Sequence, residues 1–238
     1  MATLFASDLH LDSDAPWAID AFLAFLAGPA RSADALYLLG DLFEVWVGDD
    51  DDAPDHVRTC AGLAALTGSG VPVYAIHGNR DFLLGERFAH AAGAALLPDS
   101  VVVEAGGVPT LLLHGDTLCT DDHDYQGWRR TARSAQWQRE FLAKPLAERR
   151  RVVRGLRERS KEVIQAKPAD IMDVNEGAVR EALRRHGATR LVHGHTHRPG
   201  RHELEVDGRR CERWVLPDWY GPGGYLEISG GKPRLVRW

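Results

Sequence analysis

The sequence has few cysteines and no long apolar run, and each of these absences excludes a class of protein. Three cysteines occur among 238 residues, far apart at positions 60, 119 and 211. Cysteines that are few, odd in number and far apart exclude a disulfide scaffold. They are typical of a protein in a reducing compartment. No apolar run approaches the ~18 residues of a membrane-spanning helix. The amino terminus has no basic region before its short apolar stretch, so we expect no signal peptide.

Internal repeats and low-complexity linkers are also lacking. The length corresponds to one or two domains and is sufficient to bury a full hydrophobic core. Hydrophobic residues make up 44% of the chain and charged residues 26%, which is the composition of an ordinary soluble globular protein.

Charge is distributed unevenly along the chain. The formal net charge is −5, but residues 1–55 contain twelve acidic side chains and one basic side chain. Residues 129–161 contain twelve basic and three acidic side chains, a local charge of +9. The total argues weakly against nucleic acid or anionic membranes as partners, whereas the blocks indicate solvated faces, an interaction surface or a cation site. We expect the run Asp49–Asp52 to be a solvated loop.

Short apolar runs that end in polar clusters recur along the chain and predict buried strands. These runs lie at 3–9, 33–39, 71–76, 110–113 and 191–192. Helical patterns over 16–27 and 55–68 separate the early strands, which predicts βαβ units and a largely parallel sheet. The tail from 201 to 238 has the short apolar runs and turns of an antiparallel element.

The segment 124–168 differs from the rest because it has no strand-like run and is rich in good helix formers. Val152, Leu156 and Val163 lie among arginines, which predicts an amphipathic and strongly basic helix. We interpret the segment as a helical insertion. It would form a solvated face, a nucleic-acid surface or a lid over a site. The lack of interleaved aromatic residues disfavours the nucleic-acid surface.

Side chains of the metal-ligand type follow five predicted strands. Because parallel strands present their carboxyl ends at one edge, these side chains should meet there. Seven ligands without a thiolate exceed the needs of one ion and suit two ions that share a carboxylate, with Mn²⁺ or Fe²⁺ favoured over structural Zn²⁺. The candidates are Asp8, His10, Asp41, Asn79, His114, His195 and His197.

This series of motifs resembles the calcineurin-like metallophosphoesterases. The longer motifs are SDLHLD (7–12), GDLFEVWVGDD (40–50), HGNRDFL (77–83), HGDTLCTDDHDYQ (114–126), IMDVN (171–175) and HGHTHRP (193–199). Together they resemble the UDP-2,3-diacylglucosamine diphosphatase family of lipid A biosynthesis. The resemblance implies an α/β sandwich of β-sheets flanked by helices, with residues 1–123 and 169–238 as core and 124–168 as a helical lid.

The resemblance also implies roles for the ligands. Asp8, His10 and His197 would hold one ion, and Asn79, His114 and His195 the other, with Asp41 bridging and Mn²⁺ as the usual metal. Metal-activated water would attack the α-phosphorus of the UDP-sugar and give UMP and 2,3-diacylglucosamine 1-phosphate. The implied catalytic residues are Asp41, Arg80 and His195. The implied substrate contacts are Asn79, Arg80, Asp122, Ser160, Ile164, Lys167 and His195.

Arg80 stands where the wider superfamily commonly has histidine. A guanidinium does not deprotonate near neutral pH, so we expect Arg80 to bind phosphate oxygens and stabilise charge instead of moving a proton. Position 164 can be Asn in the family, and Ile164 lacks its polar group. Glu44 stands where the superfamily often has Asp. We expect Asp81 and Asp116 to orient neighbouring ligands, and His193 and Cys119 to have structural roles.

The expected setting is the cytoplasmic face of the inner membrane, where a basic amphipathic lid would contact an anionic surface. The partners are then a lipid-linked UDP-sugar and the membrane, with no nucleic acid and no obligate protein partner. The alternatives are a two-metal phosphoesterase for a soluble nucleotide or phosphoprotein, and a non-catalytic scaffold. The candidates for an apolar wall beside the site are Trp46, Phe82, Leu83, Tyr125, Trp128, Phe141, Leu142 and Leu146.

Overall fold

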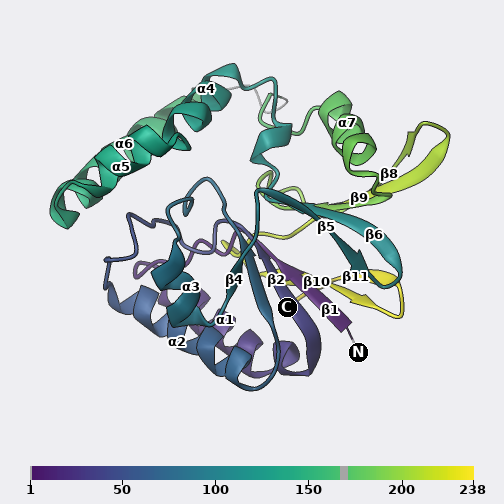
Figure 1. The fold of residues 1–238 in the computed structure, drawn as a ribbon, viewed down its shortest axis with the longest axis horizontal. Helices are drawn as coiled ribbons and strands as arrows, with labels where there is room; N and C mark the ends of the chain where they lie inside the picture. Colours follow the sequence, from purple (N-terminus) through teal and green to yellow (C-terminus); the bar gives the residue numbers. More distant parts are fainter. Residues whose placement is uncertain (1, 167–170) are drawn as a thin grey trace.

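Two β-sheets pack face to face and helices cover both outer faces, so the fold is a four-layer sandwich (Figure 1). The computed structural model describes residues 2–166 and 171–238, with side chains described for 2–158 and 171–238. This architecture confirms the predicted α/β sandwich.

The first sheet has the strand order β11-β10-β1-β2-β3-β4. Its strands are β1 (Ala2–Ala6), β2 (Ala33–Leu39), β3 (Val73–Ile76), β4 (Ala95–Leu96), β10 (Gly224–Ser229) and β11 (Lys232–Arg237). Strands β1 to β4 are parallel, whereas β10 and β11 add antiparallel pairs beside β1. Helices α1 (Pro16–Ala27), α2 (Pro54–Gly68) and α3 (Glu86–Ala92) pack on its outer face. Proline in the first turn of α1 and α2 costs no helical hydrogen bond there.

The second sheet has the strand order β5-β6-β7-β9-β8. Its strands are β5 (Ser100–Ala105), β6 (Val108–Leu113), β7 (Arg190–His193), β8 (Gly200–Val206) and β9 (Arg209–Val215). The central strands β6, β7 and β9 are parallel, and the edge strands β5 and β8 are antiparallel to their neighbours. Helix α7 (Glu176–His186) covers the outer face through Val179 and Leu183.

The core between the sheets contains side chains from the middle of both. Phe5, Leu39, Leu112, Val192 and Leu226 are fully buried there. Parallel neighbours in the first sheet are β1, β2 and β3, and parallel neighbours in the second are β6 and β7. The loops that follow these strands can therefore supply residues to one site.

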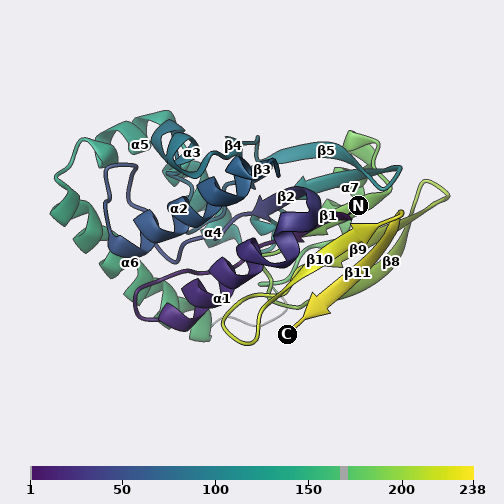
Figure 2. The same ribbon diagram turned by 90° about the horizontal axis from the view of Figure 1, so that it is seen from below.

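Three further helices follow β6 and the short helix η2 (Asp116–Leu118). They are α4 (His123–Ala132), α5 (Ala135–Leu142) and α6 (Leu146–Ala166). Both views show α5 and α6 on one side of the molecule and the β8–β9 hairpin on the opposite side (Figure 2). No helix in the described ranges combines the length and the apolar character that a bilayer span needs.

The structure corrects three details of the sequence-based interpretation. The predicted largely parallel sheet is divided into two mixed sheets, and the single antiparallel tail element contributes one hairpin to each. Helices α3 and α7 and strands β4 and β5 were not predicted. Strand β4 is two residues long, so it leaves no periodic pattern in the sequence. Helix α7 buries Val179 and Leu183, one turn apart, an amphipathic pattern that sequence analysis did not use.

The prediction of a solvated loop at Asp49–Asp52 was wrong in part, because the segment is a loop with Asp50 and Asp52 exposed, but Asp49 is half-buried and Asp51 is buried. The Asp49 carboxylate accepts hydrogen bonds from the backbone N–H groups of Gly85, Arg87 and Phe88, where α3 begins. Asp50 forms an ion pair with Arg149, and the buried Asp51 forms one with Arg150. The acidic run therefore joins α3 and the basic helix α6 to the core.

Candidate metal centre and its adjoining cleft

Five of the seven predicted metal ligands have a left-handed backbone conformation. Asp8, His10, Asp41, His195 and His197 have φ between 50° and 68°. Among the described residues other than glycine, one more has positive φ, and it lies in the β8–β9 turn. Such a conformation costs about 1–3 kcal/mol per residue and persists where the surrounding structure enforces it, commonly at functional sites.

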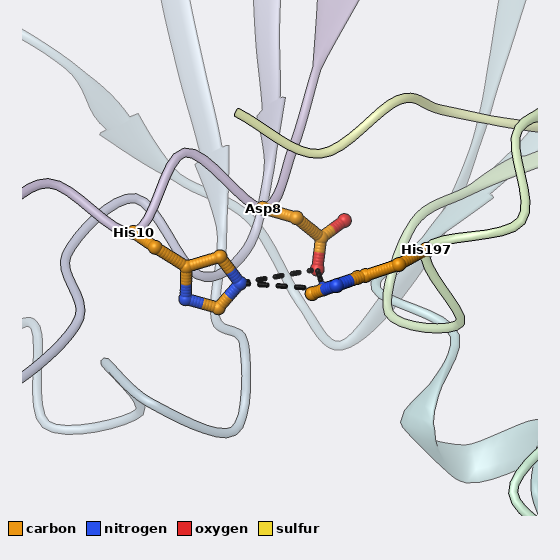
Figure 3. Close-up of side chains that lie close together, drawn as sticks. All are labelled: Asp8, His10 and His197. Carbon is orange, nitrogen blue, oxygen red and sulfur yellow. Dashed lines mark hydrogen bonds and ion pairs between the residues drawn. The ribbon is translucent and has the colours of Figure 1, made fainter. Parts of the chain in front are cut away.

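The first group of ligands is formed by Asp8, His10 and His197 (Figure 3). Asp8 Oδ1 lies 3.3 Å from His197 Nε2 and 4.0 Å from His10 Nε2. The two Nε2 atoms of His10 and His197 are 3.3 Å apart. Three ligand atoms thus converge from the loop after β1 and the loop after β7.

The second group shares Asp8 with the first and also contains Asp41, His114 and Asn79. Asp8, Asp41 and His114 each offer an atom within 4.8 Å of the others. His114 Nε2 is 3.0 Å from Asn79 Oδ1 and 3.7 Å from Asp41 Oδ2. The same Asp41 Oδ2 is 4.0 Å from His10 Nε2. One oxygen of Asp41 therefore lies within reach of both groups, which is the position that a bridging carboxylate requires.

Close polar contacts at the other ring nitrogens orient two of the histidines, His114 through a hydrogen bond and His10 through a neighbouring carboxylate. His10 Nδ1 is 2.7 Å from Glu44 Oε2, and His114 Nδ1 is 2.8 Å from the Leu39 carbonyl oxygen. A donated N–H at Nδ1 leaves Nε2 as the acceptor, which is how proteins prepare histidine for a metal. The ligand atoms are carboxylate oxygens, an amide oxygen and imidazole nitrogens. This set of atoms therefore fits divalent cations.

Burial and mutual attraction shift the protonation of these groups. Burial raises the pKa of Asp41 to about 6, against the lowering effect of nearby imidazoles. Burial alone would lower the pKa of His114, but the carboxylates of Asp41, Asp8 and Asp116 raise it to about 9. A proton on an imidazole here offsets the clustered negative charge. Metal binding must displace that proton, because a coordinating imidazole is neutral.

Two glycines permit the close approach of the loops. A Cβ at Gly78 would lie 2.1 Å from Asp41 Oδ1, and one at Gly194 would lie 2.0 Å from Asp8 Oδ2. The glycine before Asn79 and the glycine before His195 therefore leave space for the carboxylates of the neighbouring loops. Any side chain at these two positions would displace a predicted ligand.

Asp81 acts on the backbone of the ligand loops. Its fully buried carboxylate accepts hydrogen bonds from the N–H groups of Gly78 at 2.8 Å, Leu42 at 2.7 Å and Asp41 at 3.3 Å. It thereby joins the loop after β2 to the loop after β3. Among the described residues, its hydrogen bonds run to the backbone of the ligand loops and not to the side chain of Asn79.

Asp116 connects the loop after β6 to helix α4. Its Oδ2 accepts hydrogen bonds from Tyr125 Oη at 2.6 Å and Arg129 Nε at 2.7 Å. Burial alone would raise the pKa of Asp116, but the charges of His114, His195 and Arg129 hold it below the ordinary range. Asp116 therefore links α4 to the metal ligands.

The rings of His195 and His114 are 5.1 Å apart between centroids. No nitrogen of His195 joins either group of converging ligand atoms, although its backbone N–H donates to Asp8 at 2.9 Å. His193 is fully buried, hydrogen bonds to the Gly194 carbonyl oxygen, and burial lowers its pKa to about 3. His193 thus makes structural contacts beside the ligands.

A cleft of about 680 Å³ adjoins the ligand groups, and we call it the apolar cleft. Asn79, Arg80, Asp122 and His195 line it. Arg80 donates its backbone N–H to Asp41 Oδ1 at 2.7 Å, while its buried Nε has no hydrogen-bond partner in the described part of the chain. Asp122 also caps α4 by accepting the Tyr125 N–H at 3.1 Å. Further lining side chains are Trp46, Phe82, Leu83, Tyr125, Trp128, Trp137, Phe141, Val153, Leu156 and Met172.

Some predicted residues do not line this cleft. Leu142 and Leu146 are absent from its lining, although Leu146 packs on the core and Leu142 is exposed. The side chains of Ser160 and Ile164 and the whole of Lys167 lie outside the described residues. Cys119 is buried and lines the cleft, and burial raises the pKa of its thiol to about 12, so it is not a thiolate nucleophile.

Sequence analysis missed Tyr220, which lies beyond the last recognised motif. Its ring stacks on His10 at 4.5 Å, and its hydroxyl donates to Glu44 Oε2 at 3.1 Å. Glu44 also forms an ion pair with Arg157 of α6. Burial alone would raise the pKa of Glu44, but His10, Arg80 and Arg157 lower it to about 2. The local sequence around Tyr220 carries no signal that it meets His10.

Comparisons with known proteins agree with this geometry. A family model described as calcineurin-like phosphoesterase matches residues 1–199. The chain is 52% identical to UDP-2,3-diacylglucosamine hydrolase of Aromatoleum aromaticum over 99% of this chain and 96% of that protein. It is 49% identical to the protein of the same name from Escherichia coli O81, over 99% of this chain and 98% of the relative.

Solved structures resemble the fold at low identity. An archaeal phosphodiesterase gives a TM-score of 0.51 at 13% identity, with 100% of both chains covered. A phosphoesterase of E. coli, Yfce, gives 0.50 at 16% identity, covering 100% of this chain and 93% of that one. With the family match, these findings show that this chain belongs to the calcineurin-like phosphoesterase family, alongside members named UDP-2,3-diacylglucosamine hydrolase.

Proposed function

We propose that this chain hydrolyses the pyrophosphate bond of UDP-2,3-diacylglucosamine in lipid A biosynthesis. Water attacks the α-phosphorus, and the products are UMP and 2,3-diacylglucosamine 1-phosphate. The observation that carries the proposal is that Arg80 lines the apolar cleft and also donates its backbone N–H to the ligand Asp41. The names of relatives at about half identity over nearly the whole chain support the same substrate.

The ligand groups support a centre for two divalent ions, with Mn²⁺ as the proposed metal. Asp8, His10 and His197 would hold one ion, and Asn79, His114 and His195 the other. Asp41 would bridge them. When bound, such a pair lowers the pKa of water and neutralises the attacking and leaving oxygens of a phosphoryl displacement.

Arg80 binds and stabilises the pyrophosphate. Its Nε is a buried donor without a partner, so a phosphate oxygen would satisfy it. A guanidinium remains charged at every relevant pH and donates in a planar fork that matches phosphate. Asp41 fixes the position of Arg80 by accepting its backbone N–H. Arg80 therefore offsets the negative charge that develops during the displacement.

The apolar cleft accommodates the acyl chains. Its aromatic wall comes from the core through Phe82 and from α4 and α5 through Trp128, Trp137 and Phe141. We assign residues 124–168 as the lid and residues 1–123 and 169–238 as the core. Asp122, Ser160, Ile164 and Lys167 are the proposed contacts from the lid and its borders.

The proposed setting is the cytoplasmic face of the inner membrane, where the chain is a peripheral protein. Trp128 is 39% exposed and Leu142 is 42% exposed, and both lie on the helices that surround the cleft. Arg130 and Arg139 are exposed on the same helices. Exposed apolar side chains beside cations suit an anionic lipid surface.

A substrate series tests the proposed function. The purified Mn²⁺-loaded protein should release UMP from the diacylated UDP-sugar at a kcat/KM at least about 100-fold above that for the deacylated sugar, since two buried chains supply several kcal/mol. The Asp41→Asn variant is the inactive control. Equal rates on the deacylated sugar and on simple nucleotides would contradict the proposal and favour a phosphoesterase for soluble substrates.

A further inference from the structure

A second cleft of about 620 Å³ lies beside the ligand groups. It is lined by the loop after β1, the beginnings of α1 and α2, and the first half of α6. Asp12, Asp14, Trp17, Asp55, His56 and Arg154 are among its lining side chains. We call it the polar cleft because much of its lining is charged or polar, whereas the wall of the apolar cleft is largely aromatic and aliphatic.

The two clefts share a wall. His10, Glu44, Arg157 and Tyr220 line both of them. Arg157 pairs with Glu44 and lies 4.0 Å from Asp12, yet its buried Nε has no hydrogen-bond partner among the described side chains. A molecule whose reacting phosphates lie at His10 can therefore extend into both clefts. The guanidinium of Arg157, with its unused donor, lies where the two clefts meet.

The substrate of the proposed function has two chemically different halves on either side of its pyrophosphate. The diacylated sugar is apolar and suits the aromatic wall of the apolar cleft. The uridine half has ribose hydroxyls and an N–H that donate hydrogen bonds and carbonyl oxygens that accept them. It therefore needs carboxylate acceptors and a cationic donor near an aromatic surface, which are the residue types of the polar cleft.

Three side chains of the polar cleft are available to such a ligand. Trp17 is 49% exposed, and its indole contacts no other aromatic ring among the described residues. Arg154 is exposed, and no ion pair is found for it in the described part of the chain. His56 is 6% exposed and its Nδ1 has no hydrogen-bond partner. Together they offer a stacking surface, a cation and an unused ring nitrogen.

We propose that the polar cleft is the nucleoside subsite, which holds the uracil and ribose of the UDP-sugar and of the product UMP. This assignment rests on the proposed function, because it takes the nucleotide to be one half of the substrate. Trp17 stacks on the base, the carboxylates of Asp12 and Asp14 accept ribose or base donors, and Arg154 donates to a base carbonyl. Arg157 contacts the phosphate that joins the two clefts.

Photochemical crosslinking with 4-thio-UMP tests the subsite without measuring turnover. The Mn²⁺-loaded protein is irradiated with the probe, digested, and the labelled peptides are identified by mass spectrometry. Label is expected in peptides that contain residues 9–18 or 53–58, and excess UMP should abolish it. Label in residues 79–83 or 122–141 instead, or label that UMP does not displace, would overturn the assignment.

Paired variants give a second measurement. Trp17→Ala should weaken inhibition by UMP about ten-fold, the effect of losing one stacked base, and should leave inhibition by the lipid product unchanged. Trp128→Ala in the apolar cleft should show the reverse pattern. Arg154→Gln should weaken UMP inhibition, while Arg151→Gln, an exposed arginine of the same helix that lines neither cleft, should not.

The outcomes separate the subsite from the proposed function. Hydrolysis of the diacylated UDP-sugar with UMP inhibition unaffected in Trp17→Ala and Arg154→Gln would overturn the subsite alone. Failure to hydrolyse that sugar would overturn the proposed function, whatever the crosslinking pattern.

Discussion

The hydrogen bonds of Asp81 make a quantitative prediction about how the metal centre is held. The Asp81→Ala variant removes the acceptor of three buried N–H groups, those of Asp41, Leu42 and Gly78. Each buried donor left without a partner costs about 1–3 kcal/mol. We expect a loss of about 3–5 kcal/mol in the free energy of unfolding, the lower part of the sum, because water can enter the vacated space.

Two comparisons isolate the cause. Asp81→Asn retains one oxygen with two acceptor positions, so its cost should be about 1–3 kcal/mol. Asp34→Ala removes an exposed carboxylate and should change stability by less than about 0.5 kcal/mol. Unfolding is measured with urea by circular dichroism in the presence of a chelator, so that bound metal does not contribute.

Asp81 should also influence metal binding, because the loops it joins carry Asp41 and Asn79. We expect the affinity of Asp81→Asn for Mn²⁺, measured by equilibrium dialysis, to fall about 10–100-fold. A stability loss in Asp81→Ala no larger than that in Asp34→Ala would refute the reasoning. Unchanged Mn²⁺ affinity in a destabilised Asp81→Asn protein would limit Asp81 to a role in stability.

Three further predictions concern Arg80, Glu44 and Glu212. Arg80→Ala should lower kcat about 100-fold while metal content by atomic spectroscopy persists; loss of metal would show a misassigned role. Glu44→Gln should weaken Mn²⁺ binding about 10-fold by loosening His10, and unchanged binding would argue against that coupling. Burial alone would raise the pKa of Glu212, but Arg190 lowers it. The ionised Glu212 therefore stabilises the fold above about pH 4.5, and this contribution is lost on acidification. The difference in the free energy of unfolding between the wild type and Glu212→Gln should shrink between about pH 6 and pH 3. A difference that does not change with pH would contradict this.

The structure explains why acidic and basic side chains are concentrated in separate segments, a distribution that the net charge conceals. Three arginines of the basic helix α6 pair with three carboxylates of the acidic segment 44–51. Arg149 is 2% exposed and also donates to the Val47 carbonyl oxygen at 2.7 Å. Part of the positive charge of the insertion therefore holds α6 to the core and is unavailable to a membrane or substrate. Among the other basic side chains, Arg130, Arg139, Arg151 and Arg154 are exposed.

The sequence by itself determined the fold class and the candidate ligands. Strand-like runs that end in Asp8, Asp41 and His114 predict side chains gathered at one sheet edge, because the carboxyl ends of parallel strands meet there. Asn79, His195 and His197 follow predicted strands in the same way, and the family resemblance then implied which ion each ligand would hold. These features are local patterns, so they can be recognised in a single amino-acid sequence.

Only the tertiary structure decided the contacts between distant segments. The left-handed backbone of the ligand loops, the hydrogen bond from Tyr220 to Glu44 and the pairing of α6 with the acidic run all depend on residues far apart in the chain. No periodic pattern encodes which carboxylate meets which guanidinium, because that choice follows from the packing of whole elements. The same packing turned a predicted solvated loop, Asp49–Asp52, into the joint between the core and its basic helix.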